Sequence, residues 1–379
     1  MSLQQQNNSQ PVEICGLSKF HITLSSGNPQ DHIYANGRMQ CGVFITIHAF
    51  DCAHNGITLS GEQLDNIKLI NYSTGKTLSN GWSYSSDKNS YHHTFPYAKN
   101  SQVSDLSYEE ITNNKSNTEI SYQSKIYWVT TTKIEAIKIG ALVTFNGKTY
   151  TTTGVDTSSF NSYASVTTHE ALIYHTADLI GTGVEEIASG SYIVHEKIDN
   201  RTWDTTHTSE KDVNYPWTQS NWYITTKKGF AVHDVSIWNT MEDKDRRNKK
   251  FHGFSHLTHS SSIFGFGAAD LYLWFIWGLD VEDRAAGTDY ATTSYSVSRG
   301  LGRADKYTYT TDPIVQLHTT TRKDAISISK LYLKSPVKNL WTDKQSNKPS
   351  FQFRDVYGNE SGVIQIEMDN YNQFHFKDM

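Results

Sequence analysis

The run MQCGVFITIHA, residues 39–49, carries the clearest structural signal in the chain. Its apolar side chains fall on every second position: Met39, Cys41, Val43, Ile45, Ile47 and Ala49. Polar Gln40, Thr46 and His48 stand between them. Because successive side chains of a strand point to opposite faces, this alternation predicts a long, half-buried β-strand.

Turn signals further along the chain favour antiparallel pairing. Asn146-Gly147 separates two strand-like segments and predicts a tight hairpin. Near the C-terminus, residues 359–362 form a turn that precedes a second predicted hairpin. Ser60, with Gln63 three residues later, predicts a short capped helix of one or two turns. We therefore expect an all-β protein, mainly β with a few short helices, built from two or three antiparallel β-sandwich domains of Ig-like or jelly-roll-like type.

Changes in composition suggest where these domains begin and end. Residues 1–12 are polar and rich in Gln and Asn, which predicts a flexible N-terminal arm. A polar, irregular stretch over 85–120 predicts a long connection. The expected units are a β-sandwich domain at 13–105, a central β-rich domain at 120–300 and a C-terminal β unit at 310–379.

Composition and charge exclude several classes of function. The net charge of −5, from 34 basic and 39 acidic residues, offers no field that attracts nucleic acid, so we expect no nucleic-acid partner. The N-terminus shows no signal peptide, which predicts synthesis in the cytoplasm, with release as part of a particle left open. The three cysteines, Cys15, Cys41 and Cys52, form no CxxC pair, and we expect buried thiols and no disulfide framework.

The most apolar stretch, residues 263–279, contains Asp270 and several glycines. It is too short and interrupted to predict a membrane-spanning helix, and buried sheet is favoured. A membrane partner is therefore not expected. The alternative is a membrane-active toxin component in which this stretch inserts into a bilayer.

No motif predicts catalysis or a cofactor. His252, His256 and His259 have a spacing that would place them on one face of a helix, where they are candidate metal ligands. Gly253 and the serines that follow disfavour a helix, so we expect a polar loop or strand and no metal. His169-Glu170 and His195-Glu196 lie on strand-like runs, where adjacent residues face opposite ways, so neither forms a catalytic pair.

Aromatic side chains gather in one polar stretch: Trp203, Tyr215, Trp217, Trp222 and Tyr223. Exposed aromatic rings beside amides and carboxylates suit the apolar faces and hydroxyl rims of sugars. These residues are therefore the candidates for a glycan site in a lectin or adhesin module. The alternative is that they pack in a sheet core or a subunit interface.

Three segments resemble known sequences: IYANGRMQCGVFITIHAFD, LSGEQLDNIKLINYSTGKTL and FRDVYGNESGVIQIEMDN. They look like segments of uncharacterised bacterial β-rich proteins, some of them from phage-derived or other self-assembling particles. The resemblance implies no catalytic residues. Together with the low charge density, it favours a non-enzymatic structural protein that binds copies of itself or partner subunits in a larger bacterial or phage-like particle.

Overall fold

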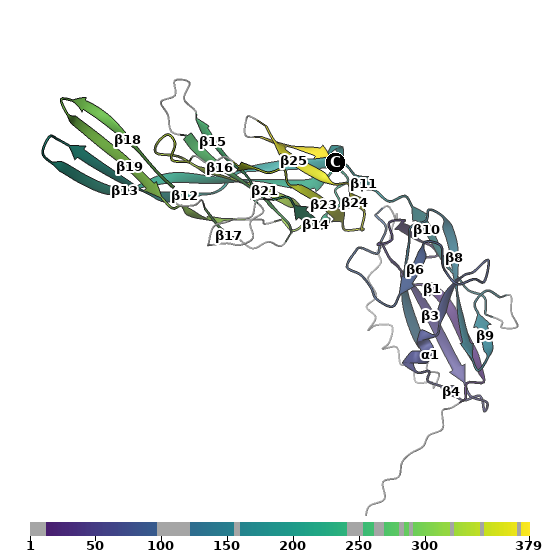
Figure 1. Ribbon diagram of the computed structural model, residues 1–379. Helices are drawn as coiled ribbons and strands as arrows, with labels where there is room; N and C mark the ends of the chain where they lie inside the picture. Colours follow the sequence, from purple (N-terminus) through teal and green to yellow (C-terminus); the bar gives the residue numbers. More distant parts are fainter. Residues whose placement is uncertain are drawn as a thin grey trace, which may run out of the picture. The chain divides into compact units, whose positions relative to one another are not determined.

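The computed structural model describes residues 13–96, 122–154, 160–240, 253–260, 269–279, 284–287, 291–318, 322–341, 345–369 and 373–379. Nearly all regular structure in them is β-strand (Figure 1), and the predicted all-β class is confirmed. The helical elements of this part of the chain are α1 (Gly61–Asp65) and the 3-10 turn η1 (Thr176–Asp178). Neither helix has the length or hydropathy needed to span a bilayer. The sandwich arrangement of the domains stays a prediction.

The chain divides into two compact units. Unit 1 comprises residues 1–172 and 357–359, and unit 2 comprises residues 173–356 and 360–379. This division differs from the three segments that composition suggests, because strand pairing crosses the predicted boundaries. In unit 1, residues 41–47 pair with residues 123–129, so strands on both sides of the polar connection share a sheet. In unit 2, residues 326–333 of the predicted C-terminal unit pair with residues 217–224 of the predicted central domain. The predicted arm at residues 1–12 lies outside the described residues.

Among its described residues, unit 1 contains two five-stranded sheets. The first has the order β1-β3-β7-β6, with β4 also paired to β3. Its strands are β1 (Gly16–Leu24), β3 (Cys41–Phe50), β4 (Gly56–Ile57), β6 (Trp82–Ser85) and β7 (Gln123–Thr131). The second has the order β2-β10-β8-β5, with β9 also paired to β8. Its strands are β2 (Asp31–Tyr34), β5 (Lys68–Asn71), β8 (Ala136–Phe145), β9 (Lys148–Thr151) and β10 (Ala164–His169).

The core of unit 1 draws on both sheets. Val43 and Ile45 of β3 belong to the same buried cluster as Ile139 and Val143 of β8. The six apolar residues that alternate through 39–49 are all buried, which confirms the strand predicted there.

Local turn chemistry also follows the sequence. Ser60 and Gln63 form a reciprocal capping box at the start of α1. Asn146 and Gly147 both have positive φ, 48° and 77°, as the two-residue hairpin between β8 and β9 requires. Both predictions are confirmed.

The expectation for the cysteines was wrong in one respect. Cys15 and Cys52 form a disulfide, with Cα atoms 5.0 Å apart, whereas Cys41 is a buried thiol. The antiparallel register of β1 and β3 places Gly16 opposite Phe50, so the cysteines just beyond this pair meet. Their 37-residue separation gives no hint of this contact.

In the part of the chain that the structure describes, unit 2 contains three sheets. An eight-stranded sheet has the order β18-β19-β12-β13-β21-β16-β15-β22. Its strands are β12 (Leu179–Arg201), β13 (Thr206–Thr226), β15 (Gly253–Ser260), β16 (Ala269–Trp277), β18 (Ala291–Gly300), β19 (Arg303–Thr311), β21 (Ile326–Leu333) and β22 (Gln345–Ser346). A two-stranded sheet pairs β17 (Arg284–Gly287) with β20 (Ile314–Leu317).

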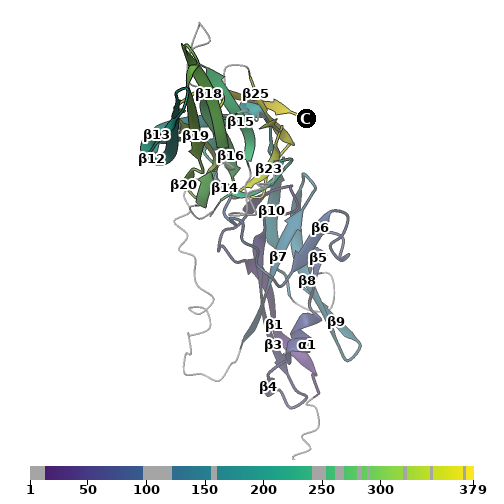
Figure 2. The ribbon, with the colours of Figure 1, turned by 60° about the vertical axis from the view of Figure 1, so that its left-hand side comes forward.

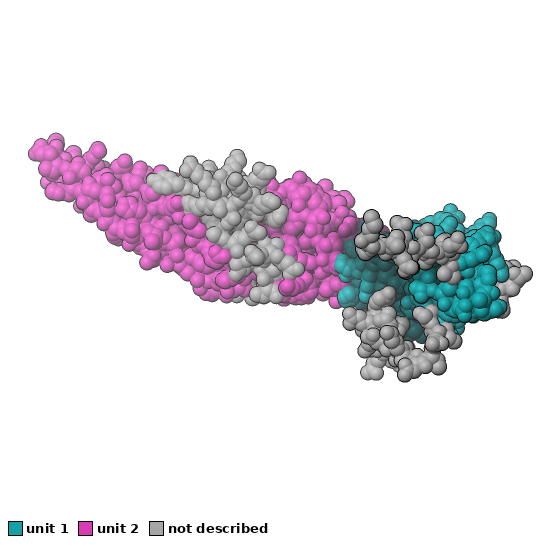
Figure 3. Space-filling view, turned by 90° about the horizontal axis from the view of Figure 1, so that it is seen from below, with its two compact units in different colours: residues 1–172, 357–359 teal, residues 173–356, 360–379 magenta. Residues whose placement is uncertain are grey.

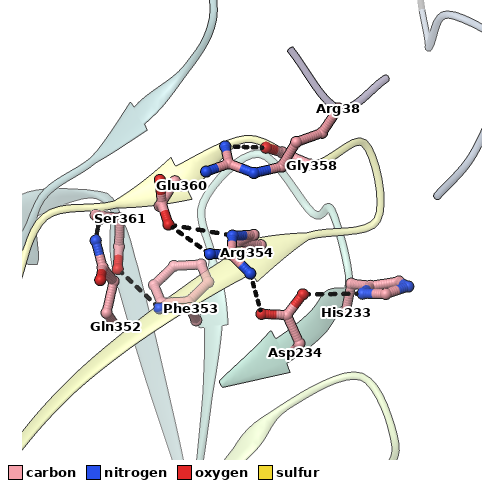
Figure 4. Close-up of polar contacts among 9 residues, drawn as sticks. All are labelled: Arg38, His233, Asp234, Gln352, Phe353, Arg354, Gly358, Glu360 and Ser361. Carbon is pink, nitrogen blue, oxygen red and sulfur yellow. Dashed lines mark hydrogen bonds and ion pairs between the residues drawn. The ribbon is translucent and has the colours of Figure 1, made fainter. Parts of the chain in front are cut away.

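The third sheet of unit 2 has the order β11-β24-β23-β25-β26, with β14 paired to β23. Its strands are β11 (Ile173–Tyr174), β14 (Val232–Trp238), β23 (Ser350–Asp355), β24 (Glu360–Ser361), β25 (Ile364–Met368) and β26 (Phe374–Asp378). The Arg354 guanidinium links three of them, since it donates to Asp234 (3.2 Å) on β14 and to Glu360 (3.1 Å) on β24 (Figure 4). The pair β25–β26 is the predicted C-terminal hairpin.

The main core of unit 2 surrounds β16, which lies between β15 and β21. Leu271, Phe275 and Trp277 of this strand belong to one buried cluster with Trp217 of β13. The part of the apolar stretch that the structure describes, 269–279, is therefore largely buried sheet, as the sequence predicts. Residues 263–268 lie outside the described residues.

Candidate functional site

Two neighbouring hairpins extend one end of the eight-stranded sheet beyond its core. They are the outer part of β12–β13, residues 193–201 and 206–215, and the whole of β18–β19, residues 291–311. We call this four-stranded region the hairpin sheet. Figures 1 and 2 show β18 and β19 beside β12 and β13, and in Figure 3 unit 2 narrows toward this end.

The hairpin sheet has two chemically different faces. Register and strand alternation place tyrosines and aliphatic residues on one face, together with the Glu196–Lys211 ion pair: Ile198, Tyr215, Tyr295, Val297, Tyr307 and Tyr309. The opposite face carries a polar set: His195, Lys197, Thr208, Glu210, Asp212, Ser294 and Ser296. We call these the aromatic face and the polar face.

The aromatic face remains partly open to solvent. Tyr295 is 42% exposed and Val297 is 44% exposed, and the Tyr295 ring stacks on Tyr307 with centroids 5.1 Å apart. Tyr215 donates its hydroxyl to Glu196 (2.9 Å). Burial, followed by this hydrogen bond, raises the pKa of Tyr215 to about 12, so the phenol keeps its proton.

The hairpin sheet is a regular block of antiparallel rows. Its innermost row joins Ala291, Thr311, Val194 and Val213. Its last row before the tips joins Ser298, Ala304, Arg201 and Thr206. No register shift occurs between these rows. Both outer strands therefore offer edges of matching length.

Both outer strands lack a strand partner on their outer side among the described residues. β18 pairs with β19 alone, and β13 pairs with β21 only from Trp217 onward. The carbonyl of Pro216 still accepts a hydrogen bond from the Lys334 backbone N–H (3.1 Å). The open part of the β13 edge therefore lies N-terminal to Pro216. Residues 206–214 of β13 and 291–298 of β18 are thus open edges.

The hydrogen-bond alternation identifies which backbone groups face these edges. The Thr202 N–H donates to the Thr205 carbonyl (2.8 Å), so this pair closes the hairpin. Because hydrogen-bonded and non-hydrogen-bonded pairs alternate along antiparallel strands, the pattern can be followed across the sheet. By this pattern, the even-numbered residues 206–214 of β13 and 292–298 of β18 have their backbone N–H and C=O groups on the outer side of the sheet.

The two edges differ in their charge. Residues 291–298, ATTSYSVS, contain no charged side chain and no proline. These are two of the features by which proteins prevent exposed edge strands from pairing with other chains, and this segment of β18 has neither. On β13 the charges are paired within the same sheet. Glu210 lies 3.3 Å from Lys197, Lys211 lies 3.1 Å from Glu196, and Asp212 lies 2.9 Å from His195.

The tips of the two hairpins contact each other. The Trp203 indole packs across Gly302, where a Cβ atom would approach the ring within 3.2 Å. Gly302 also has φ of +72°, a backbone conformation that favours glycine at this turn. Trp203 nevertheless stays 71% exposed.

The structure spreads the five glycan candidates over different surroundings. Trp217 and Tyr223 are buried, whereas Tyr215 and Trp222 are half-buried. Trp222 lies on the face of β13 opposite Trp217 and contacts Trp274 and Phe374. Only Trp203 is widely exposed, and it lies at the hairpin tip. The five rings therefore do not form one surface cluster.

The histidine candidates for a metal site lie on a strand or outside the described residues. His256 and His259 belong to β15, where their backbones pair with Leu273 and Asp270, so the helical spacing does not apply. His252 lies outside the described residues. In the described part of the chain, the one group with three ligand atoms within 4.8 Å is Glu13, Cys15 and Cys52, whose cysteines are joined as a disulfide.

Sequence reasoning missed residues 291–298, which hold no motif. Their only signal was a run of Thr, Ser, Tyr and Val without charge, which is typical of a strand but does not reveal an open edge. Comparisons with family models, with curated proteins and with solved structures find no match for this chain.

Proposed function

We propose that this protein is a non-enzymatic structural subunit that binds other protein chains through its hairpin sheet, within a larger particle. The observation that carries the proposal is the pair of open edges on β13 and β18. An open edge presents a row of N–H and C=O groups, to which another strand adds by main-chain hydrogen bonds.

The character of the surface supports this proposal. Because residues 291–298 of β18 carry no charge, they do not repel a charged strand that approaches this edge. The partly exposed Tyr295 and Val297 offer the aromatic and apolar contact area that enriches protein interfaces. A net charge of −5 on 379 residues leaves little repulsion between copies.

Light scattering coupled to size-exclusion chromatography tests the proposal. We expect the full chain to form oligomers whose mass rises with concentration. The variant Ser296→Lys places a charge on the open edge and should shift the equilibrium at least tenfold toward the monomer. Ser73→Lys, at an exposed turn of unit 1, is the matched control and should assemble like the parent. A parent chain that stays monomeric at every concentration would refute the proposal.

A further inference from the structure

We infer that the chain bound at the hairpin sheet is a second copy of this protein, added head to tail, with the β18 edge of one copy against the β13 edge of the next. This inference rests on the proposed function and specifies its partner and geometry. Three independent features of the hairpin sheet carry it: strand direction, backbone register and side-chain charge.

Strand direction favours addition in the same orientation. The order β18-β19-β12-β13 is antiparallel at every step. β18 and β13, the two outer strands, therefore run in opposite directions. A second copy in the same orientation consequently brings its β13 alongside β18 as an antiparallel neighbour, and the alternation continues without interruption.

Backbone register gives the two edges the same pattern. The even-numbered residues face outward on both, 292–298 on β18 and 206–212 on β13, and the rows of the sheet align these segments. An in-register second copy therefore pairs Ser298 with Thr206, Ser296 with Thr208 and Ser294 with Glu210. Each of these is a hydrogen-bonded pair, so the outward N–H and C=O groups of both edges are satisfied together.

Side-chain charge favours this pairing over a symmetric one at β13. Against β18, Glu210 and Asp212 meet Ser294 and Thr292, which are neutral hydroxyl residues. Two copies joined by their β13 edges in the centred register would place Glu210 opposite Glu210, and like charges directly opposite destabilise a sheet. The mixed pairing contains no such contact.

The consequence is an assembly in which each copy uses both edges. Such an interface is heterologous, so it continues from copy to copy until it closes into a ring or grows as a filament. The aromatic faces of successive copies then lie on the same side of the extended sheet, since Tyr295 lies in the same row as Ser209 of the next copy.

Two edge-blocked variants test the inference. Ser296→Pro removes an outward N–H from β18, and Thr208→Pro removes one from β13, whereas Ser296→Ala and Thr208→Ala keep both N–H groups. Each proline variant alone should stay monomeric at concentrations where the parent forms larger assemblies, because every β18–β13 contact needs both edges intact. Circular dichroism melts matching those of the alanine variants establish that the variants fold.

The decisive measurement combines both blocks. A chain carrying Ser296→Pro and a chain carrying Thr208→Pro each retain one intact edge, and a double-blocked chain retains none. Mixing the single-blocked chains with the parent should give assemblies with capped ends and a lower mean mass, and the double-blocked chain should be monomeric and should not alter parent assemblies. A double-blocked chain that assembles like the parent overturns the inference.

Cysteine cross-linking separates this inference from the proposed function. Ser296→Cys mixed with Thr208→Cys should give a disulfide-linked pair of different chains under mild oxidation, and each variant alone should give at least tenfold less. Self-linked Ser296→Cys chains would indicate symmetric β18 pairing, which overturns the inference but preserves binding at the hairpin sheet. A monomeric parent refutes both.

Discussion

At the scale of single residues, a buried hydrogen-bond network ties β13 to β21 and β16. Asn221 and Ser329 are fully buried, and the Ser329 hydroxyl donates to the side-chain amide oxygen Oδ1 of Asn221 (2.6 Å). The Trp277 indole N–H donates to the Ser329 oxygen (2.9 Å). Because buried polar groups need partners, removing Ser329 leaves the indole N–H of a buried tryptophan without this acceptor.

We therefore expect Ser329→Ala to lower the free energy of unfolding of unit 2 by about 1–3 kcal/mol. Ser327 offers a matched control: it is equally buried, two residues away on the same strand, and its hydroxyl has no partner among the described residues. Ser327→Ala should leave the stability unchanged or raise it, because it removes a buried hydroxyl that has no partner. Urea denaturation of both variants measures the difference, and equal losses would contradict this role of Ser329.

We expect a histidine pair to make the stability of unit 1 depend on pH. His169 and His32 lie on the neighbouring strands β10 and β2, with ring nitrogens 2.9 Å apart, and Phe95 stacks on His169. Burial and then the charge of His32 lower the pKa of His169 below its ordinary value of 6.5. As pH falls below about 6.5, the unfolded chain therefore takes up this proton before the folded chain does.

The stability contributed by neutral His169 is thus present above pH 6.5 and is lost as the pH falls toward the lowered pKa. Thermal melts of unit 1 between pH 7.5 and 5.5 should show a falling melting temperature. His169→Gln removes the titrating group and should flatten this dependence. An unchanged slope in the variant would assign the pH effect to other groups.

At the scale of elements, tight turns set the pairing of neighbouring strands. Gly147 has φ of +77°, and none of the described residues comes within 4 Å of a Cβ placed there, so an alanine meets backbone strain but no clash with them. Gly147→Ala should lower the stability of unit 1 by about 1–2 kcal/mol. Gly61 at the start of α1 has equal space and no positive φ, so Gly61→Ala should be neutral or stabilising. Thermal melts that rank the two variants in the opposite order would contradict this account.

At the scale of the whole molecule, each unit has its own buried cluster, and only unit 1 contains cysteines. All three cysteines lie in unit 1, and the disulfide Cys15–Cys52 joins the start of β1 to the end of β3. Reduction should therefore destabilise unit 1 by about 2–4 kcal/mol and leave unit 2 unaffected. Differential scanning calorimetry with and without reductant measures this, and Cys52→Ser should abolish the response. A shift in the unit 2 transition would show that the units are not independent.

The sequence by itself determined the local elements of this protein. The alternation over 39–49, the Ser60–Gln63 capping box and the Asn146-Gly147 turn each depend on residues a few positions apart, and each is present as predicted. These signals are readable because the geometry of strands, caps and tight turns is set by neighbouring residues.

Only the tertiary structure decided which strands pair, and this placed the unit boundary, the disulfide and the candidate site. Cys15 meets Cys52, and β2 joins β10 across more than 130 residues, through registers that local pattern does not encode. The open edges of the hairpin sheet depend on where the pairing of β13 with β21 stops, at Trp217. An edge is defined by the absence of a neighbour in space, and for that physical reason residues 206–214 and 291–298 look in sequence like any other exposed strands.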